Sequence, residues 1–426
     1  MSDATQIPSK PKARLKFIDM ARSFAILLML EGHFTGAALD SAYRAQPNGD
    51  YEYPLFGLWH LLHGLTSPLF FTVTGLIFAY LLIGRDTREL KFWENIRVRK
   101  GLKRVLQLLF WGYLIQLNLW SIAKAFYYGT DVHWSWFQAF HVLQAIGIGL
   151  LLVIIVYRVY KWLNFGELHW YYLIAGLVIF TCYGLLKEYM KLDQDLVAQG
   201  IRSSNQYWPV NAPKFVQNMF YGEYSSFSAL RMASYTLFGA MIGVIVRKTE
   251  LHVKKWWYGT SFIVFGLLLT VLARTLLVGI DEILFDWGIV DQGTMWYGST
   301  ALSRFGQVIV LLGIIILIDK FFRIKDSLFL KIGQNTFPIY VVHVIILYGG
   351  LFGFGLNGNV FERDLHPWIA VAISASAIIT FTIMVKYMEP LTKVYYKINI
   401  FHRAAGWLKR HLLRFWSRVF NIEPNS

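Results

Sequence analysis

Long apolar segments alternate with short polar ones along this chain. A transmembrane helix needs about 20 mostly apolar residues. Ten segments approach or exceed that length, near residues 17–35, 59–83, 104–125, 138–157, 168–186, 228–246, 257–280, 301–318, 330–350 and 367–389. Hydrophobic residues make up 56% of the chain and charged residues only 16%, whereas soluble domains carry roughly a quarter charged residues. The pattern predicts an all-α, polytopic integral membrane protein with about ten transmembrane helices.

The distribution of positive charge predicts the orientation of these helices. Lysine and arginine number 29 in the segments on the side of the N-terminus and 6 in those on the opposite side. Cytoplasmic loops carry the excess of these residues, so we expect both termini in the cytoplasm. The net charge of +15 then reflects membrane topology, and no nucleic-acid partner is expected. A multi-pass protein of the cell inner membrane, surrounded by membrane lipids, is predicted.

Three regions are predicted along the chain. Residues 1–16 form a polar, disordered cytoplasmic head, and residues 17–390 form the transmembrane domain. Residues 391–426 form a basic amphipathic cytoplasmic tail, in which Leu, Trp and Phe alternate with basic residues at helical spacing.

Because a small-residue cleavage site is lacking, the first segment is expected to be an uncleaved anchor. Cys182 is the single cysteine, which excludes a cysteine metal cluster, and no metal is predicted.

Aromatic residues gather in the long connections on the side opposite the N-terminus. Trp and Tyr often form a belt at the membrane–water interface. Their flat apolar faces can also bind sugar rings, so both interpretations stand. The residues are Trp134, Trp136, Trp208, Trp287, Trp296, Tyr207, Tyr221 and Tyr297.

The first apolar segment contains charged and titratable residues, which are costly in a bilayer and indicate function by default. Arg22 and His33 are eleven residues apart. This spacing is close to three helical turns, so the two side chains share one face about 16 Å apart along the axis. Asp19 lies near the same stripe, whereas Glu31 falls on the opposite side. His33 could be a histidine that hydrogen-bonds between helices, but in phase with Arg22 it is the predicted proton acceptor.

The connection 84–104 is the densest basic patch outside the tail. Arginine and lysine bind phosphates through charge-assisted hydrogen bonds, so the patch would suit a ligand with several phosphates. Positive-inside bias alone is the competing explanation. The candidate donor-binding residues are Arg97, Arg99, Lys100, Lys103 and Arg104.

Two further apolar segments carry polar candidates. The second contains Ser67 and Pro68, and a proline there predicts a kinked helix that lines a cavity or is packed by neighbours. The ninth places Asn335, Tyr340 and His343 in apolar surroundings, with the last two on one face at i and i+3. His343 is the second candidate for the catalytic residue.

Four of these stretches resemble motifs of membrane acyltransferases of the acyltransferase-3 kind. Arg22 and His33 enclose ten residues, as in the signature of that family, although Ser23 stands where the family usually has Gly. SPLFFTVTG in the second segment is similar to the PxFFxxSG stretch of the family. The segment 141–152 resembles GVLQRIxLxYLL of the heparan-α-glucosaminide N-acetyltransferase branch, and 332–343 resembles LGxxxLxIYxxH. The matches occur in family order.

The resemblance implies an enzyme that transfers an acyl group from cytoplasmic acyl-CoA, such as acetyl-CoA, to an extracytoplasmic glycan or sugar. The basic connection and Arg22 would bind the donor. His33 would deprotonate the acceptor or become acylated itself, and Asp19, Ser67, Asn335 and Tyr340 would line the site. A transporter or flippase of a sugar- or lipid-linked substrate is the alternative, because intramembrane charges and broken helices also occur there.

Overall fold

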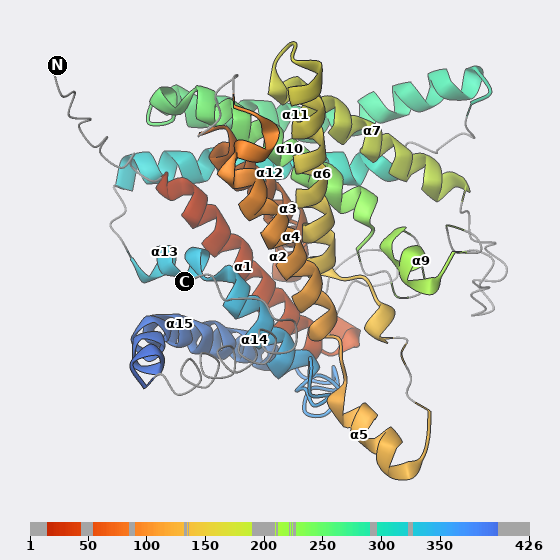
Figure 1. Cartoon of the computed structure of the whole chain (residues 1–426), viewed down its shortest axis with the longest axis vertical. Helices are drawn as coiled ribbons and strands as arrows, with labels where there is room; N and C mark the ends of the chain where they lie inside the picture. The colour runs from red at the N-terminus through yellow and green to blue at the C-terminus, as the bar shows by residue number, and fades with distance from the viewer. Residues whose placement is uncertain are drawn as a thin grey trace, which may run out of the picture.

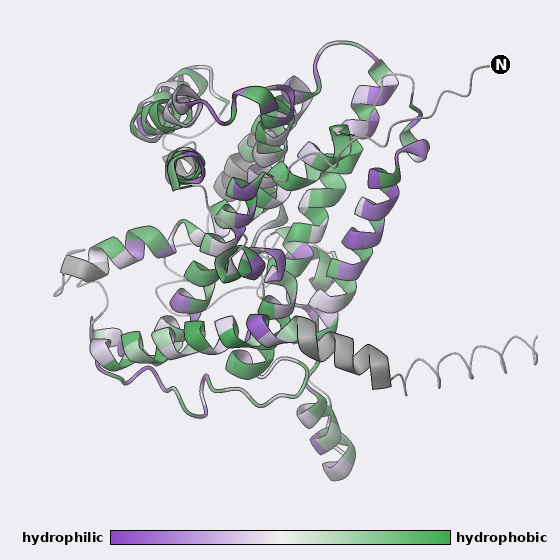
Figure 2. Cartoon of the chain, turned by 90° about the vertical axis from the view of Figure 1, so that its left-hand side faces the viewer, coloured by the Kyte–Doolittle hydropathy of each residue, from purple (hydrophilic) through white to green (hydrophobic). Residues whose placement is uncertain are grey.

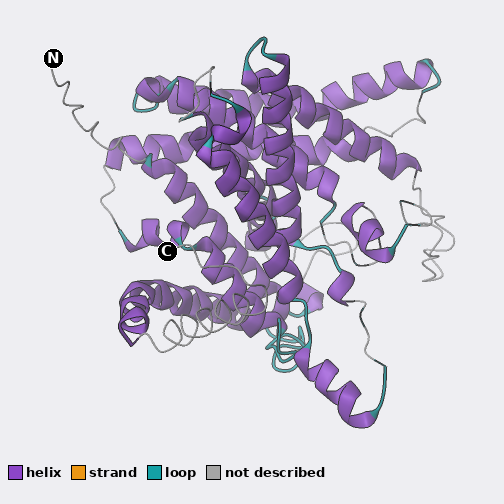
Figure 3. Ribbon diagram, in the orientation of Figure 1, coloured by secondary structure: helices purple, strands orange, loops and turns teal. Residues whose placement is uncertain are grey.

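The computed structural model describes residues 15–43, 54–84, 90–131, 136–189, 212–220, 227–289, 296–322 and 327–398, with a few single positions between them. The described residues form helices joined by loops, with three isolated bridges and no β-strand among them (Figure 3). Residues 1–14 of the predicted head lie outside the described residues, and the first helix begins at Lys16. Most of the predicted amphipathic tail lies outside the described residues, and the last helix continues past residue 390 to Ile398.

Each of the ten predicted apolar segments coincides with one helix or with a pair of helices (Figure 1). The helices are α1 (Lys16–Ala38), α2 (Pro54–His63), α3 (Thr66–Ile83), α4 (Ile96–Leu114), α5 (Leu119–Tyr128), α6 (Val142–Leu163), α7 (Leu168–Tyr189), α9 (Lys214–Phe220), α10 (Ala229–Lys248), α11 (Trp256–Asp286), α12 (Trp296–Phe322), α13 (Leu328–Gln334), α14 (Thr336–Tyr348) and α15 (Pro367–Ile398).

Six helices of the described chain are long and apolar enough to cross a membrane, and the bent pair α13–α14 would be a seventh. Apolar residues dominate these long helices (Figure 2). The predicted class is therefore confirmed as an all-helical, multi-pass membrane protein. The count of ten spans and the cytoplasmic termini stay predictions. The six spans are Gly57–Ile83, Val142–Leu163, Ala229–Lys248, Trp256–Asp286, Ala301–Phe322 and Pro367–Met388.

The boundaries of the third predicted segment, 104–125, were wrong at both ends. Helix α4 already begins at Ile96, because the side chain of Asn95 accepts a hydrogen bond from the Arg97 N–H and caps the helix. The basic residues predicted in a connection are therefore helical. At the other end, α4 stops at Leu114, and α5 begins separately under an Asn118 cap. There the chain turns to hydrogen-bond with the loop that follows α14, and α5 extends away from the other helices (Figure 1).

Two further predicted segments are interrupted between two helices, the ninth with a sharp bend. The second breaks between α2 and α3 at Gly64, four residues before Pro68, which lies within the first turn of α3 where proline is tolerated. Arg304 of α12 packs against Gly64 and donates to the carbonyl of Leu61 at 3.0 Å. This bond satisfies a backbone group that the break leaves open. The ninth segment bends by 78° between α13 and α14, at Asn335.

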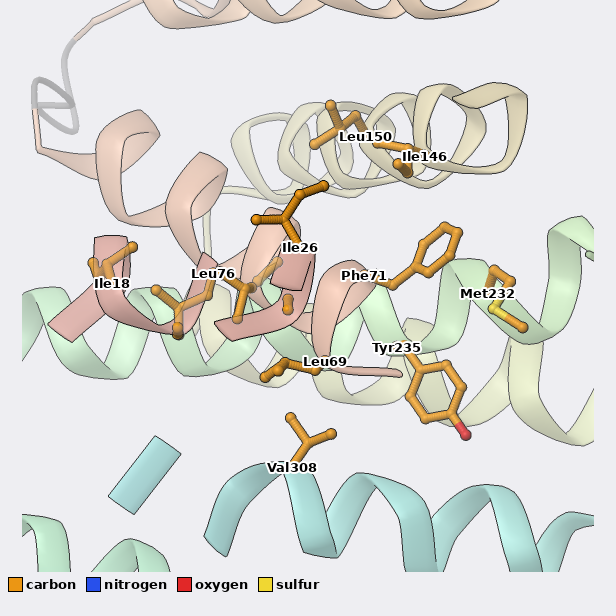
Figure 4. Packing of buried hydrophobic residues seen from close by; sticks show 14 of the residues in the cluster. Ile18, Ile26, Leu69, Phe71, Leu76, Ile146, Leu150, Met232, Tyr235 and Val308 are labelled. Carbon is orange, nitrogen blue, oxygen red and sulfur yellow. The ribbon is translucent and has the colours of Figure 1, made fainter. Parts of the chain in front are cut away.

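Helix α1 lies at the centre of the fold and contacts α2, α3, α12, α13, α14 and α15. Helix α3 in turn packs closely on α10, where Gly239 and Gly243 meet the backbone of α3 so closely that a Cβ at either position would overlap it. Small residues four apart allow such close approach in membranes. The buried side chains between these helices include Ile18, Ile26, Leu69, Phe71, Leu76, Ile146, Leu150, Met232, Tyr235 and Val308 (Figure 4).

Candidate active site

Three cavities follow one another along α1. The first, of about 210 Å³, contains Arg22 and Arg104 and is called the arginine cavity. The second, of about 40 Å³, contains His33 and Ser67 and is called the narrow cavity. The third, of about 240 Å³, also contains His33 and is called the histidine cavity. Because Phe70 and Tyr340 line both of the first two cavities, and His33 lines both of the last two, the cavities form a series from Arg22 to His33.

Arg22 is held where α1 meets the bend between α13 and α14. Its guanidinium donates to the hydroxyl of Thr336 at 3.1 Å and lies 3.9 Å from the carboxylate of Asp19. The other carboxylate oxygen of Asp19 accepts from Gln334 at 3.4 Å. Asp19 is buried, so it orients Arg22 from behind while the guanidinium faces the cavity. The predicted pairing of these two residues on one stripe of the helix agrees with the structure.

The close approach of α13 to α1 accounts for a small residue after Arg22. Ser23 is fully buried, and its hydroxyl donates to the carbonyls of Asp19 and Phe329. Gly333 packs so closely on Asp19 and Ser23 that a Cβ there would overlap them. A larger side chain at residue 23 would separate the two helices and displace the Arg22 contact with Thr336.

Of the five candidate donor-binding residues on α4, Arg104 lines the arginine cavity. Its guanidinium lies 4.6 Å from the centre of the Phe337 ring, in a cation–π contact. Arg97 lies half-buried two turns earlier on the same face of α4. The three remaining candidates are exposed along α4 and do not line the three cavities. They are Arg99, Lys100 and Lys103.

His33 lies at the centre of a cluster of polar aromatic rings. Its Nδ1 is 2.7 Å from the hydroxyl of Tyr348. Its ring meets that of His343 edge to face at 5.3 Å, and the rings of Tyr340 and His343 are 5.0 Å apart. The predicted pairing of the last two is therefore correct, and the fold brings both to His33. His343 is fully buried and lines none of the three cavities, whereas His33 faces two of them.

A second histidine faces the histidine cavity from the break after α2. His63 packs on Gly32 and stacks on the ring of Trp59, with a centroid distance of 5.3 Å. The indole N–H of Trp59 donates to the carboxylate of Glu31 at 2.6 Å. Glu31 thus anchors α2 to α1. It does so from the side of α1 that faces away from Arg22, where the helical period predicted it to lie. His63 is held beside His33 as a result.

The loop 349–366 forms the remaining wall of the histidine cavity, with Asn357 and Arg363. Its ends are fixed by backbone hydrogen bonds. The N–H of Asn357 donates to Leu347 at 2.8 Å, and the N–H of Leu365 donates to Ala38 at 3.1 Å. The loop therefore ties the end of α14 to the end of α1.

Of the two remaining predicted lining residues, one lies at a cavity and the other does not. Ser67 lines the narrow cavity beside His33. Asn335 lies at the bend between α13 and α14, where its amide donates to the carbonyl of Lys331 at 2.8 Å, outside the three cavities. Among the described residues, no group of three His, Cys, Asp or Glu side chains could hold a metal ion.

Besides His63 and Asn357, further residues at these cavities were not among the predicted site residues, and three of them bear on the site. Thr336 binds Arg22, Tyr348 binds His33, and Arg363 faces the histidine cavity. The sequence offers one signal for the last, since Arg363 is the single cation in the outer connection 351–366. The other two contacts join residues more than 300 positions apart, which no local pattern reveals.

Comparison with models of protein families identifies the family of this chain. The Acyltransferase domain family, acyltransferase-3, matches residues 15–387. The chain belongs to this family. The match covers α1 and every helix that lines the three cavities, and it confirms the resemblance seen in the sequence motifs. No curated protein sequence matches this membrane acyltransferase.

Proposed function

We propose that this membrane acyltransferase transfers an acyl group, most simply acetyl, from cytoplasmic acyl-CoA to a hydroxyl or amine of an extracytoplasmic glycan or small sugar. The observation that carries the proposal is the series of cavities along α1. An acyl-CoA has several phosphates at one end, a long thin arm and a thioester at the other. The cavities offer cations at one end, apolar walls between, and His33 at the other.

The arginine cavity suits the donor. Arg22 and Arg104 supply charge-assisted hydrogen bonds for anionic or carbonyl oxygens, and most of the other lining residues are apolar, among them Val73, Ile77 and Leu150. The other cations of α4 would attract the phosphates before the arm enters. Arg97, Arg99, Lys100 and Lys103 are proposed for this outer role.

The narrow cavity favours a short acyl group. At about 40 Å³ it has room for only a few atoms beside His33. The rings of Phe70, Phe71 and Phe227 contribute to its walls. A thioester that reaches His33 through this constriction would leave little space for a long acyl chain, which supports acetyl as the transferred group.

His33 is the proposed catalytic residue. When the Tyr348 hydroxyl accepts the Nδ1–H of His33, Nε2 is left as the proton acceptor. As a general base, Nε2 takes the proton of the acceptor O–H or N–H while that atom attacks the thioester carbonyl. The C–S bond then breaks, and the proton passes to the CoA thiolate. In the alternative mechanism, Nε2 attacks the thioester carbonyl first, the C–S bond breaks and CoA leaves as its thiolate. The acceptor O–H or N–H then attacks the acyl-imidazole, the N–acyl bond breaks, and the acceptor proton passes to the CoA thiolate.

Thioester cleavage by the purified protein tests this function. The protein is reconstituted in liposomes with radiolabelled acetyl-CoA on one face and a mixed panel of sugars on the other. Release of free CoA together with labelled sugar in the opposite compartment is the expected result. Movement of a sugar or lipid-linked sugar across the bilayer with no CoA release would indicate a transporter or flippase instead. Absence of both CoA binding and CoA release would overturn the proposal.

A further inference from the structure

The polar lining of the histidine cavity consists of hydrogen-bond donors and basic groups. His33, His63, Tyr348, Asn357 and Arg363 line it together with small residues of α1, and no carboxylate is among the lining residues. Glu31, the nearest acid on α1, binds Trp59 and Thr35 instead. Arg363 is the one charged side chain among these lining residues, so the cavity offers a single positive charge to whatever molecule reaches His33 from this side.

Arg363 adopts a backbone conformation that is unusual for its residue type. Its φ is 60°, in the left-handed region that costs energy for residues other than glycine. The structure holds it there because Leu365, two residues on, is hydrogen-bonded to Ala38 and Asp40 at the end of α1. Backbone strain of this kind persists where the surroundings over-determine the conformation, and it clusters at ligand sites.

The guanidinium of Arg363 is not committed to an ion pair. Glu362 and Asp364 are its sequence neighbours, yet no carboxylate of the described chain lies within salt-bridge distance of it. It is also the single cation between residues 351 and 366. An exposed arginine that lines a cavity without an acidic partner is a ready binding group for an anionic ligand.

On this basis we infer that the acceptor is an anion, a sugar or polyol that carries a carboxylate or a phosphate close to the hydroxyl or amine that is acylated. Arg363 binds the anionic group through its planar fork of N–H donors. Asn357 and His63 supply further hydrogen bonds, and the acceptor hydroxyl then lies at His33. The inference rests on the proposed acyl transfer and specifies its acceptor.

The test compares acceptors that differ in charge. Wild-type protein in liposomes is given acetyl-CoA with glucose, glucuronate, glucuronate methyl ester or glucose 6-phosphate. Acyl transfer is expected to be faster to glucuronate or to glucose 6-phosphate than to glucose and the methyl ester. Faster transfer to glucuronate would indicate an acceptor that carries a carboxylate. Faster transfer to glucose 6-phosphate would indicate an acceptor that carries a phosphate.

The decisive variant is Arg363→Gly, because glycine accepts the positive φ without strain and the fold is kept. It should lower kcat/KM for the preferred anion about 10- to 100-fold, as expected for lost hydrogen bonds to a charged group. The rate with glucose should fall much less. Arg363→Lys should restore part of the preference for the anion. Lys124→Ala, which removes an exposed cation from α5 outside the cavity, is the matched control and should change neither rate.

Two results separate this inference from the proposed function. If the wild-type protein releases CoA but acylates glucose as fast as both anions, and Arg363→Gly leaves the ratio unchanged, the anionic acceptor is wrong and acyl transfer stands. If acetyl-CoA is not cleaved with any acceptor, the proposed function fails and the inference fails with it.

Discussion

The arginine cavity and the histidine cavity lie along the same helix, yet their linings are opposite in kind. The arginine cavity has two cations, Arg22 and Arg104, in walls that are otherwise mostly apolar. The histidine cavity is lined by polar side chains from α1, α2, α14 and the loop 349–366. One suits a long, partly apolar molecule that is held by charge at one end. The other suits a compact polar molecule that is bound by directional hydrogen bonds.

The difference shows that one helix can line two cavities of unlike chemistry. The narrow cavity separates the two sites and shares lining residues with each, so His33 is reached from both sides. If the two cavities bind separate substrates, substitutions along α1 and its neighbours should fall into three groups. Some should change the KM for the donor, some the KM for the acceptor, and some the rate with both. The largest effect is expected where the two sites meet.

His33→Gln should reduce acyl transfer by about 10²- to 10⁴-fold, the loss expected for a general base. Donor binding should be nearly unchanged, because the arginine cavity is intact. The measurement is CoA release and labelled product by the reconstituted variant, together with equilibrium binding of acetyl-CoA. His343→Gln is the matched variant. If it abolished transfer while His33→Gln retained a tenth or more of the rate, the catalytic residue would be His343 of α14.

Arg22→Gln should raise the KM for acetyl-CoA about 10- to 100-fold, because a charge-assisted hydrogen bond to the donor is lost. The KM for the acceptor should stay constant, which distinguishes the two cavities. Arg158→Ala, an exposed arginine of α6, is the control. An equal rise in both KM values would show that the two cavities do not bind separate substrates.

Tyr348→Phe should lower kcat about 5- to 10-fold, because it removes the hydrogen bond that orients His33. Tyr348 is a positioning residue, so the KM for acetyl-CoA should not change. Steady-state kinetics with each substrate varied in turn provide the measurement, and Tyr128→Phe at the exposed end of α5 is the control. A variant with normal kcat would mean that the phenol does not fix the His33 tautomer.

The double variant Arg99→Ala/Lys103→Ala should raise the KM for acetyl-CoA only about 2- to 5-fold, since exposed cations contribute little each. The effect should shrink in 0.5 M salt, because exposed charges are screened over a few ångströms at high ionic strength. Kinetics at low and high salt provide the test. A KM that equals that of the wild type at low salt would mean that these residues serve membrane topology alone.

The sequence predicted His33 and Arg22 because both lie on one helix, where the period of 3.6 residues fixes their relation. For the same reason it predicted the pairing of Tyr340 with His343. It did not distinguish Arg104 from the other basic residues of α4, because lining a cavity depends on which face the neighbouring helices cover. The contact between Tyr348 and His33 spans 315 positions, and only tertiary packing creates it.

The positions where helices break were likewise not predictable from local sequence patterns. A kink at Pro68 was expected, but the chain breaks at Gly64, where a backbone without Cβ leaves room for Arg304. The bend at Asn335 left no comparable signal in the sequence. At Gly64 the distant Arg304 bonds a backbone carbonyl that the break leaves open, whereas at Asn335 the side-chain amide of the residue itself bonds the carbonyl of Lys331.

The hydrogen bonds between Leu365 and the end of α1 have a consequence for the order of biosynthesis. Translation proceeds from the N-terminus, so His33 is made hundreds of residues before Tyr348, Asn357 and Arg363. Until those residues are inserted, the cavity around His33 lacks a wall and the imidazole lacks its hydroxyl partner. A nascent or truncated chain can therefore expose His33 without a formed histidine cavity, and the cavity is complete only when the last part of the bundle has packed on the first.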